Sequence, residues 1–184
     1  MKKLGIFMAD GCEEIEGLAV VDLVRRTDDI EITMISITDK KEVTGSHNVT
    51  FFADALSSEV DFDSLDGVIL PGGMPGTLNL GANETVNAVI KKFAAEGKLV
   101  AAICAAPSVL AAAGLLEGKN ATSYPSFEEK LTGANVVKDA VAVDGNIITS
   151  RGMGTAIDFG LEIINYLCGA ELKERVGKGI IYLS

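Results

Sequence analysis

The chain has 184 residues, of which 48% are hydrophobic and 23% charged, so it is long enough to fold as one domain around a sizeable core. Lys and Arg together number 16 against 26 Asp and Glu, and the formal net charge of -10 argues against nucleic acid or an anionic membrane surface as a partner. No apolar run reaches the length of a membrane-spanning helix. We therefore expect a single domain over residues 1–184, with no nucleic-acid partner and no membrane partner.

The three cysteines, Cys12, Cys104 and Cys168, are odd in number and widely spaced. This pattern fits reduced thiols and gives neither a disulfide framework nor a CxxC metal pair. His47 is the only histidine, so one chain cannot build a metal site that needs two or three histidines. A Cys-His hydrolase would have to use His47 as its base. These counts predict a cytoplasmic protein without a metal site.

Strand and helix patterns alternate along the chain. An apolar run at residues 3–9 predicts the first strand, and residues 13–26 follow as a helix with acids in its first turn and arginines in its last, as the helix dipole prefers. Further strands are predicted, in chain order, at 31–38, within 42–52, at 67–71, 98–103, 120–123 and 136–143, and at 146–150 after a hairpin signal at Asp144-Gly145. Further helices are predicted at 83–96, between Cys104 and Gly114, at 127–131 and at 154–167, whereas 57–66 is typical of a loop and 171–184 has no clear pattern.

This alternation predicts an α/β fold, in which a mainly parallel sheet carries helices on both faces. Ligand sites in such sheets lie at the carboxyl ends of the strands. Three segments that follow predicted strands should therefore meet at one edge of the sheet: Asp10–Glu16, Gly72–Gly76 and Cys104–Ala106.

Cys104 stands at a junction between a predicted strand and a predicted helix, as the nucleophile does in a nucleophile elbow. The N-terminus of a helix favours an anion, so we expect a thiolate and a thiol pKa well below about 8.5. The alternative is that Cys104 is a small buried hydrophobe, which is the usual role of a free cysteine. Cys168 is expected to pack at a helix end, and Cys12 to lie in a loop with exposure to solvent.

Three glutamates begin the helix that follows the first strand. Acidic residues in the first turn of a helix complement its dipole, and this accounts for the presence of Glu13 and Glu14. Glu16 shares a helix face with Glu13 and is a candidate catalytic acid. The paired glycines Gly72 and Gly73 follow a buried strand, where they either form an ordinary loop or direct backbone N–H groups at a reacting anion. The loop lacks both the dinucleotide fingerprint and the Walker lysine, so nucleotide binding has no support. His47 is most simply a polar surface or turn residue.

Four ordered motifs carry a resemblance to a known family: Gly11-Cys-Glu-Glu-Ile-Glu16, Leu70-Pro-Gly-Gly73, Ala101-Ala-Ile-Cys-Ala-Ala-Pro107 and Thr149-Ser-Arg-Gly-Met-Gly-Thr155. In this order, over nearly the whole chain, they resemble the DJ-1/ThiJ/PfpI superfamily in its DJ-1 branch. The resemblance implies a flavodoxin-like three-layer α/β sandwich and a homodimer. It also implies a reactive Cys104 beside a protonated Glu16, with backbone N–H groups of Gly73 and Ala105 at the thiolate and with Gly72 lining the site.

Two residues depart from the family pattern. Peptidases of the PfpI branch carry His directly after the nucleophile, where this chain has Ala105, so a peptidase is not expected. Many DJ-1-branch members have His before the proline where this chain has Tyr124-Pro125, and a phenol is a poor base at neutral pH. Tyr124 is therefore expected to line the site.

The resemblance implies one of two functions. The first is cofactor-free, glyoxalase- or deglycase-type action on reactive 2-oxoaldehydes, with a small aldehyde as the partner and Cys104 and Glu16 as the catalytic residues. The alternative is an oxidation-sensing stress-response protein or chaperone, in which a small oxidant converts Cys104 and the cysteine acts as a redox switch.

Overall fold

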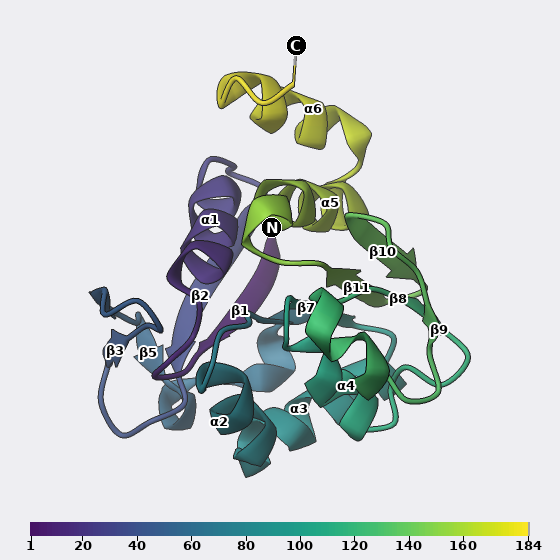
Figure 1. Cartoon of the computed structure of the whole chain (residues 1–184). Coiled ribbons are helices and arrows are strands. Elements are labelled where there is room, and N and C mark those ends of the chain that lie inside the picture. The colour runs from purple at the N-terminus through teal and green to yellow at the C-terminus, as the bar shows by residue number, and fades with distance from the viewer. Residues whose placement is uncertain (184) are drawn as a thin grey trace.

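The computed structural model describes residues 1–183, and its centre is a seven-stranded sheet in the order β10-β11-β7-β6-β1-β2-β5 (Figure 1). All neighbouring strands of this sheet are parallel except β10 and β11, which form the antiparallel edge. The strands are β1 (Lys2–Met8), β2 (Ile30–Ser36), β5 (Ala55–Leu56), β6 (Gly67–Leu70), β7 (Leu99–Ile103), β10 (Val141–Asp144) and β11 (Ile147–Ser150).

The central strands are apolar because both of their faces are covered. In β1, Leu4, Ile6 and Met8 point into the core on one side of the sheet, while Phe7 points into the core on the other side. The two neighbouring strands β6 and β7 are buried throughout. Parallel strands that are buried on both faces read as continuous hydrophobic runs, as these do.

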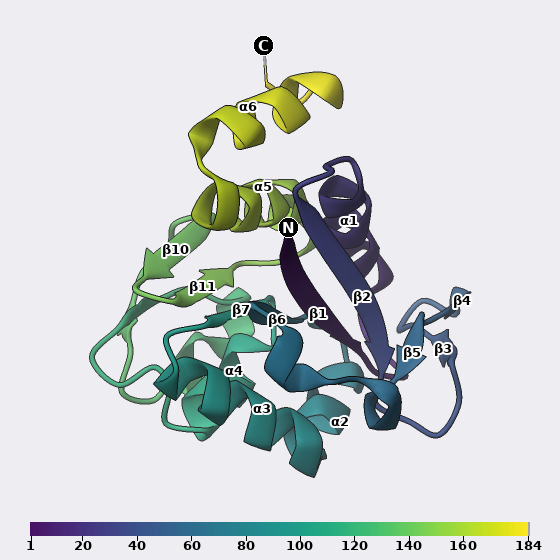
Figure 2. The same ribbon diagram turned by 180° about the vertical axis from the view of Figure 1, so that it is seen from behind.

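Helices cover both faces of the sheet, which confirms the predicted three-layer α/β fold (Figures 1 and 2). On one side lie α1 (Glu14–Arg25) and α5 (Ala156–Cys168), and α6 (Ala170–Gly179) packs on α5 from outside. On the other side lie α2 (Gly76–Ala82), α3 (Glu84–Ala95) and α4 (Pro107–Ala112). No helix within residues 1–183 combines the length and the apolar character needed to cross a bilayer.

Two small sheets stand outside the central one. The hairpin β3 (Glu42–Thr44) and β4 (Thr50–Phe52) is antiparallel, and β8 (Asn120–Ala121) pairs in parallel with β9 (Asn135–Val136). The predicted strand at 136–143 is wrong as one element, because its first part belongs to β9 and its last part to β10. The two parts pair with different sheets, so the chain must turn between them.

Some helices differ from the sequence prediction. The short helix expected at 127–131 is a 3-10 helix at Pro125–Lys130, and α4 already ends at Ala112. The helices α2 and α6 carry no clear sequence signal. The helix α2 begins with Gly76 and contains Gly81, which are poor helix formers, and it is fixed by burial of Leu80.

Candidate functional site

Cys104 lies at the sharp turn between β7 and α4, as the junction in the sequence predicts. Its φ of +64° is left-handed, a conformation that is strained for a residue with a side chain. The backbone on both sides holds the turn: the Cys104 N–H donates to the Ser150 carbonyl at 3.0 Å, and its carbonyl accepts from the Tyr124 N–H at 2.9 Å. The strained turn presents the half-buried sulfur at the carboxyl edge of the sheet.

Two backbone N–H groups reach the Cys104 sulfur, and they come from the two residues expected at this place. Gly73 follows β6 and has a φ of +87°, and Ala105 follows the cysteine itself; both donate to the sulfur. The neighbouring Gly72 has no room for a side chain, because an added Cβ would lie 2.6 Å from Cys104 Cβ. The glycine pair therefore lets the backbone approach the cysteine closely enough to donate.

Glu16 is almost completely buried, with 1% of its surface exposed, and its carboxyl group faces the same sulfur. Its Oε2 accepts from the Gly72 N–H at 2.9 Å, and hydrogen bonds also link the carboxyl group to Cys104 and to the backbone N–H of Met153. Glu13 caps α1, because its Oε2 accepts from the Glu16 N–H at 2.7 Å. The sequence predicts only complementation of the helix dipole for Glu13; the structure adds this cap, which fixes the turn that carries Glu16.

The pKa values of Cys104 and Glu16 depend on each other. Burial raises the pKa of the Cys104 thiol to about 12; the charge and hydrogen bond of the Glu16 carboxylate add to the rise, and the N–H groups of Gly73 and Ala105 oppose it. Burial also raises the pKa of the Glu16 carboxyl to about 7, against the hydrogen bonds from Cys104, Gly72 and Met153. The pair thus loses one proton near neutral pH and retains the other.

The expected depression of the Cys104 pKa is therefore wrong in direction. The sulfur is desolvated and lies beside a carboxylate, and α4 begins only at Pro107 and is six residues long, so its dipole contributes little. The thiolate exists in this pair when Glu16 keeps the remaining proton.

Tyr124 lies beside the site through its backbone bond to Cys104, and half of its surface is exposed. Gly152 and Met153 also lie at the site; they belong to the motif Thr149-Ser-Arg-Gly-Met-Gly-Thr155 but carry no sequence signal of their own. A Cβ on Gly152 would lie 3.4 Å from the Tyr124 ring and 4.0 Å from the Cys104 sulfur. A shallow pocket of about 340 Å³ extends from here, lined by Tyr124, Pro125, Arg151, Gly152, Met153, Gly154 and Thr155.

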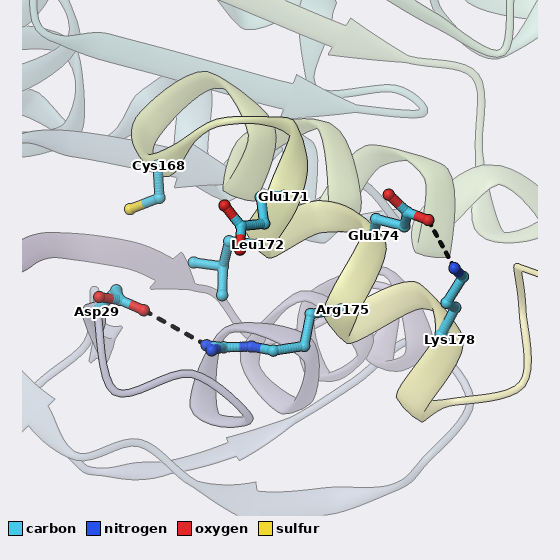
Figure 3. A pocket seen from close by; sticks show the side chains of 7 residues that line it. All are labelled: Asp29, Cys168, Glu171, Leu172, Glu174, Arg175 and Lys178. Atoms are coloured by element: carbon cyan, nitrogen blue, oxygen red, sulfur yellow. Dashed lines mark ion pairs between the residues drawn. The ribbon is translucent and has the colours of Figure 1, made fainter.

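The other two cysteines lack the surroundings of Cys104. Cys12 is fully buried, so its expected exposure is wrong: the loop is covered, since the Ser46 N–H donates to the Cys12 carbonyl at 2.7 Å. Burial, with the charges of Glu14 and Glu13, raises the Cys12 pKa to about 12. Cys168 ends α5 at a charged pocket beside α6 (Figure 3), where burial and the charge of Asp29 raise its pKa.

A model of the DJ-1/PfpI family matches residues 2–166. The chain belongs to the DJ-1/PfpI family. Protein dj-1beta of Drosophila melanogaster is 38% identical over 178 residues, which cover 96% of this chain and 95% of that protein. A deglycase of Thermococcus kodakarensis is 34% identical over 168 residues, which cover 90% of this chain and 99% of that protein.

Solved DJ-1 structures match this DJ-1/PfpI chain over its whole length. Oxidized DJ-1 of Toxoplasma gondii gives a TM-score of 0.95 at 34% identity and covers 100% of both chains. Drosophila melanogaster DJ-1beta gives 0.94 at 38% identity, covering 100% of this chain and 98% of that chain. The resemblance to the DJ-1 branch and the flavodoxin-like fold expected from it are both confirmed.

Proposed function

We propose that this DJ-1/PfpI protein converts reactive 2-oxoaldehydes, such as methylglyoxal and glyoxal, to 2-hydroxy acids without a cofactor. One observation carries the proposal: the Cys104 sulfur receives two backbone N–H groups and also faces the buried Glu16 carboxyl, whose pKa is about 7. A nucleophile, oxyanion donors and a group that exchanges protons near neutral pH are thus held together. The Thermococcus kodakarensis relative, named a deglycase, supports a reaction of this class.

In the first step the Cys104 thiol passes its proton to the Glu16 carboxylate, and the resulting thiolate adds to the aldehyde carbon. A carbon–sulfur bond forms, and the electron pair of the C=O bond moves to oxygen, where the N–H groups of Gly73 and Ala105 stabilise it. Glu16, which holds the proton of the pair, then protonates that oxygen and becomes a carboxylate. The product is a neutral hemithioacetal attached to Cys104.

The second step moves hydrogen between the two oxidised carbons. The Glu16 carboxylate removes the proton from the carbon bonded to sulfur, which gives an enediolate, and returns it to the neighbouring carbon, while the hydroxyl proton on the first carbon passes to the oxygen of the second. The result is a thioester of a 2-hydroxy acid. Water hydrolyses the thioester, so methylglyoxal plus water becomes lactate, and the Cys104 thiol is restored without any external oxidant or reductant.

A lactate assay with methylglyoxal tests this function. Reduced wild-type protein should produce lactate in steady state, and Cys104→Ser should lose the activity because the hydroxyl is a far weaker nucleophile. Cys168→Ser is the matched control and should turn over at the wild-type rate. Wild-type turnover that equals the rate without protein would refute the proposal.

A second function uses the same site as a sensor of oxidants. The relative from Toxoplasma gondii was solved as oxidized DJ-1. In this chain the N–H groups that face the Cys104 sulfur would also bind the oxygens of a sulfinate. On this reading peroxide supplies the oxygen atoms, Cys104 is the switch, and turnover of aldehydes is incidental.

Mild peroxide followed by peptide mass mapping tests the sensor. Two oxygens should add to Cys104 before Cys12 reacts, because Cys12 is fully buried and Cys104 is half-buried. Cys168 should also lag, since it lacks the backbone donors that face Cys104. Oxidation of Cys168 ahead of Cys104 would contradict the sensor and the assignment of the reactive thiol.

A further inference from the structure

The segment between β11 and α5 packs directly on the Cys104–Glu16 pair. A Cβ on Gly152 would lie 3.9 Å from Glu16 Oε1 and 4.0 Å from the Cys104 sulfur, so this backbone lies against both groups. The neighbouring Met153 N–H donates to the Glu16 carboxyl. Because a donor on a carboxylate stabilises its charged form, the position of this segment affects where the pair holds its single proton.

A chain of hydrogen bonds holds the segment in place. The Gly152 N–H donates to Thr155 Oγ1 at 3.2 Å, and Thr155 Oγ1 lies 2.7 Å from Ser150 Oγ. Ser150 Oγ in turn donates to the Ala140 carbonyl at 2.7 Å. Since the Ser150 hydroxyl gives its one hydrogen to Ala140, Thr155 is the donor between the two hydroxyls. All donors then point the same way along the chain, and hydrogen bonds aligned in this way strengthen one another.

The hydroxyl of Thr155 serves this segment and not the helix that follows it. Thr155 stands at the N-cap position of α5, where a threonine hydroxyl commonly accepts from the first helical turn, but its side chain forms no such bond. It bonds back to Gly152 and to Ser150, which is fully buried at the end of β11. The Ser150 carbonyl also accepts from the Cys104 N–H at 3.0 Å. One buried residue therefore joins the segment over Glu16 to the strained turn that carries the sulfur.

We propose that Thr155 and Ser150 are positioning residues, whose hydroxyls hold the Met153 N–H against the Glu16 carboxyl and so control the proton that Glu16 shares with Cys104. Neither hydroxyl has to touch the substrate for this role. The inference rests on the proposed function for its part in catalysis, because Glu16 carries the proton there. The arrangement itself can be tested without substrate, so its failure is distinguishable from a failure of the oxoaldehyde reaction.

Infrared difference spectroscopy of the reduced protein tests the arrangement. Each protein is compared with the same protein carrying Glu16→Gln, so that the difference isolates the Glu16 carboxyl as the pH is changed. In Thr155→Val, which keeps the size but not the hydroxyl, a weakened Met153 donor should raise the Glu16 pKa from about 7 by about one pH unit. Thr155→Ser keeps the hydroxyl and should restore the wild-type value. Cys104 and Glu13, the other titratable groups that act on Glu16, are present in all of these proteins.

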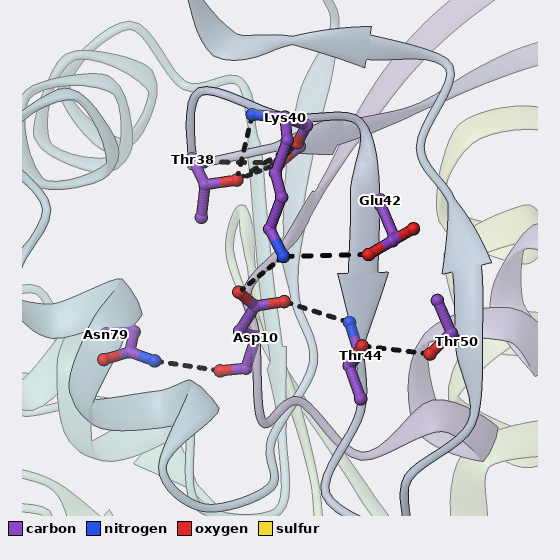
Figure 4. Close-up of polar contacts among 8 residues, drawn as sticks. Asp10, Thr38, Lys40, Glu42, Thr44, Thr50 and Asn79 are labelled. Carbon is purple, nitrogen blue, oxygen red and sulfur yellow. Dashed lines mark hydrogen bonds and ion pairs between the residues drawn. The ribbon is translucent and has the colours of Figure 1, made fainter.

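The matched control is Thr38→Val, at the end of β2. Thr38 has contacts of the same kind, because its Oγ1 lies 3.1 Å from Ser36 Oγ and accepts from the Lys40 N–H at 3.3 Å (Figure 4). These partners lie outside the site. The control therefore removes a comparable set of hydrogen bonds and should leave the Glu16 pKa at about 7.

The outcomes separate a positioning role from a merely structural one. An unchanged Glu16 pKa in Thr155→Val, or an equal rise in Thr38→Val, would overturn the proposal. If Thr155→Val does not fold, Ser150→Ala carries the same test, because it removes the next hydroxyl of the chain and keeps the carbonyl that binds Cys104. A wild-type Glu16 titration in folded Ser150→Ala would also overturn it.

The pH profile of kcat/KM with methylglyoxal is a second measurement. Its midpoint should move to higher pH in Thr155→Val together with the Glu16 pKa, and it should return in Thr155→Ser. A midpoint that stays in place while the Glu16 pKa rises would refute the part of the proposal that concerns catalysis. A raised Glu16 pKa in a protein without any turnover of methylglyoxal would support the positioning role and refute the proposed function.

Discussion

At the scale of single residues, the proposed chemistry depends on one proton shared by Cys104 and Glu16. Each group is buried, and each raises the cost of charging the other. Backbone N–H groups from Gly73 and Ala105 support charge on sulfur, while the N–H of Gly72 supports charge on the carboxyl. Backbone donors therefore stabilise the single negative charge on either the sulfur or the carboxyl group. This arrangement suits the proposed mechanism, in which the proton moves between the two groups.

The shared proton predicts a pH profile for kcat/KM with methylglyoxal. The Glu16 carboxyl has a pKa of about 7, so the pair gains its single negative charge as the pH rises through that value. We expect kcat/KM to rise with an apparent pKa near 7 and then to level off. A steady-state assay across the neutral range measures it. A flat profile through that range would show that this ionisation does not control the reaction.

The variant Glu16→Gln distinguishes the role of Glu16 from that of Cys104. Gln cannot shuttle a proton, so lactate production should fall to the rate of Cys104→Ser. The thiol pKa should lie below the wild-type value of about 12, because the charge of the carboxylate no longer raises it. Ultraviolet absorbance of the thiolate, titrated against pH, measures this change. Wild-type turnover in Glu16→Gln would leave Glu16 with a structural role only.

At the scale of elements, the site is made where the loops after β1, β6 and β7 meet. These strands are neighbours in the sheet, so their carboxyl ends lie side by side and bring Glu16, Gly73 and Cys104 together. Contacts between the loops are close: a Cβ on Gly73 would lie 2.2 Å from the backbone nitrogen of Glu13. The glycines are required by this approach of one backbone to another.

Gly72→Ala should damage the site more than the fold. The added Cβ would lie 2.6 Å from Cys104 Cβ, 2.7 Å from Glu16 Oε2 and 2.9 Å from the Ile103 carbonyl oxygen, so Cys104 and Glu16 must both shift away from it. A displacement of this kind should reduce kcat/KM for methylglyoxal on the order of a hundredfold. Kinetics and urea unfolding of the same preparation measure both effects.

The control for this variant is Gly81→Ala in α2. There an added Cβ meets its nearest neighbour, Val109 Cγ2, at an ordinary 3.6 Å. Alanine in a helix should stabilise the protein by about 0.5–1 kcal/mol and leave kcat/KM unchanged. Equal losses of activity in both variants would mean that the Gly72 effect is not local.

At the scale of the whole molecule, burial of Glu16 should make stability depend on pH. The folded pKa of about 7 lies above the ordinary value of 4.5, so the folded state binds more protons than the unfolded state between these values. Stability from this group is present below about 4.5 and is lost as the pH rises through about 7. The shift corresponds to about 3 kcal/mol.

Urea unfolding of wild type and Glu16→Gln at several pH values isolates this term. All other groups titrate in both proteins, so the difference between their free energies of unfolding reports on Glu16. The free energy of unfolding of Glu16→Gln should increase relative to that of the wild type as the pH rises from about 4.5 to about 7. Above that pH the difference between the two proteins should stay constant. Ionisation of the Cys104 thiol makes stability depend on pH only above the ordinary thiol pKa of 9.0, which is outside this window. A pH-independent difference would mean that Glu16 is not buried as an acid.

The homodimer implied by the family resemblance remains a prediction about the surface of the molecule. Ile15 at the start of α1 and Phe52 on β4 expose 52% and 68% of their surface and offer apolar area for such an interface. We expect light scattering to give a mass near twice 19.2 kDa, and Phe52→Asp to shift it toward the monomer. A monomeric wild type would contradict the prediction.

The sequence alone determined the fold class and the positions of the reactive groups. Apolar runs alternate with amphipathic segments, and a parallel α/β sheet follows because both faces of its strands must be covered. The order of strands and loops then placed Glu16, Gly73 and Cys104 at one edge, since ligand sites form at carboxyl ends of strands. These inferences depend on local pattern and general topology, which a sequence contains.

Only the tertiary structure decided which groups touch and how they ionise. The Cys104 pKa depends on burial and on its distance from Glu16, so a sequence-based argument from a helix N-terminus gave the wrong direction. The helix α2 forms because Leu80 is buried by neighbouring elements, and Cys12 is covered by the hairpin that follows much later in the chain. The contact of His47 with Glu13 and Glu14 joins residues 33 or more positions apart, a separation at which no local pattern carries information.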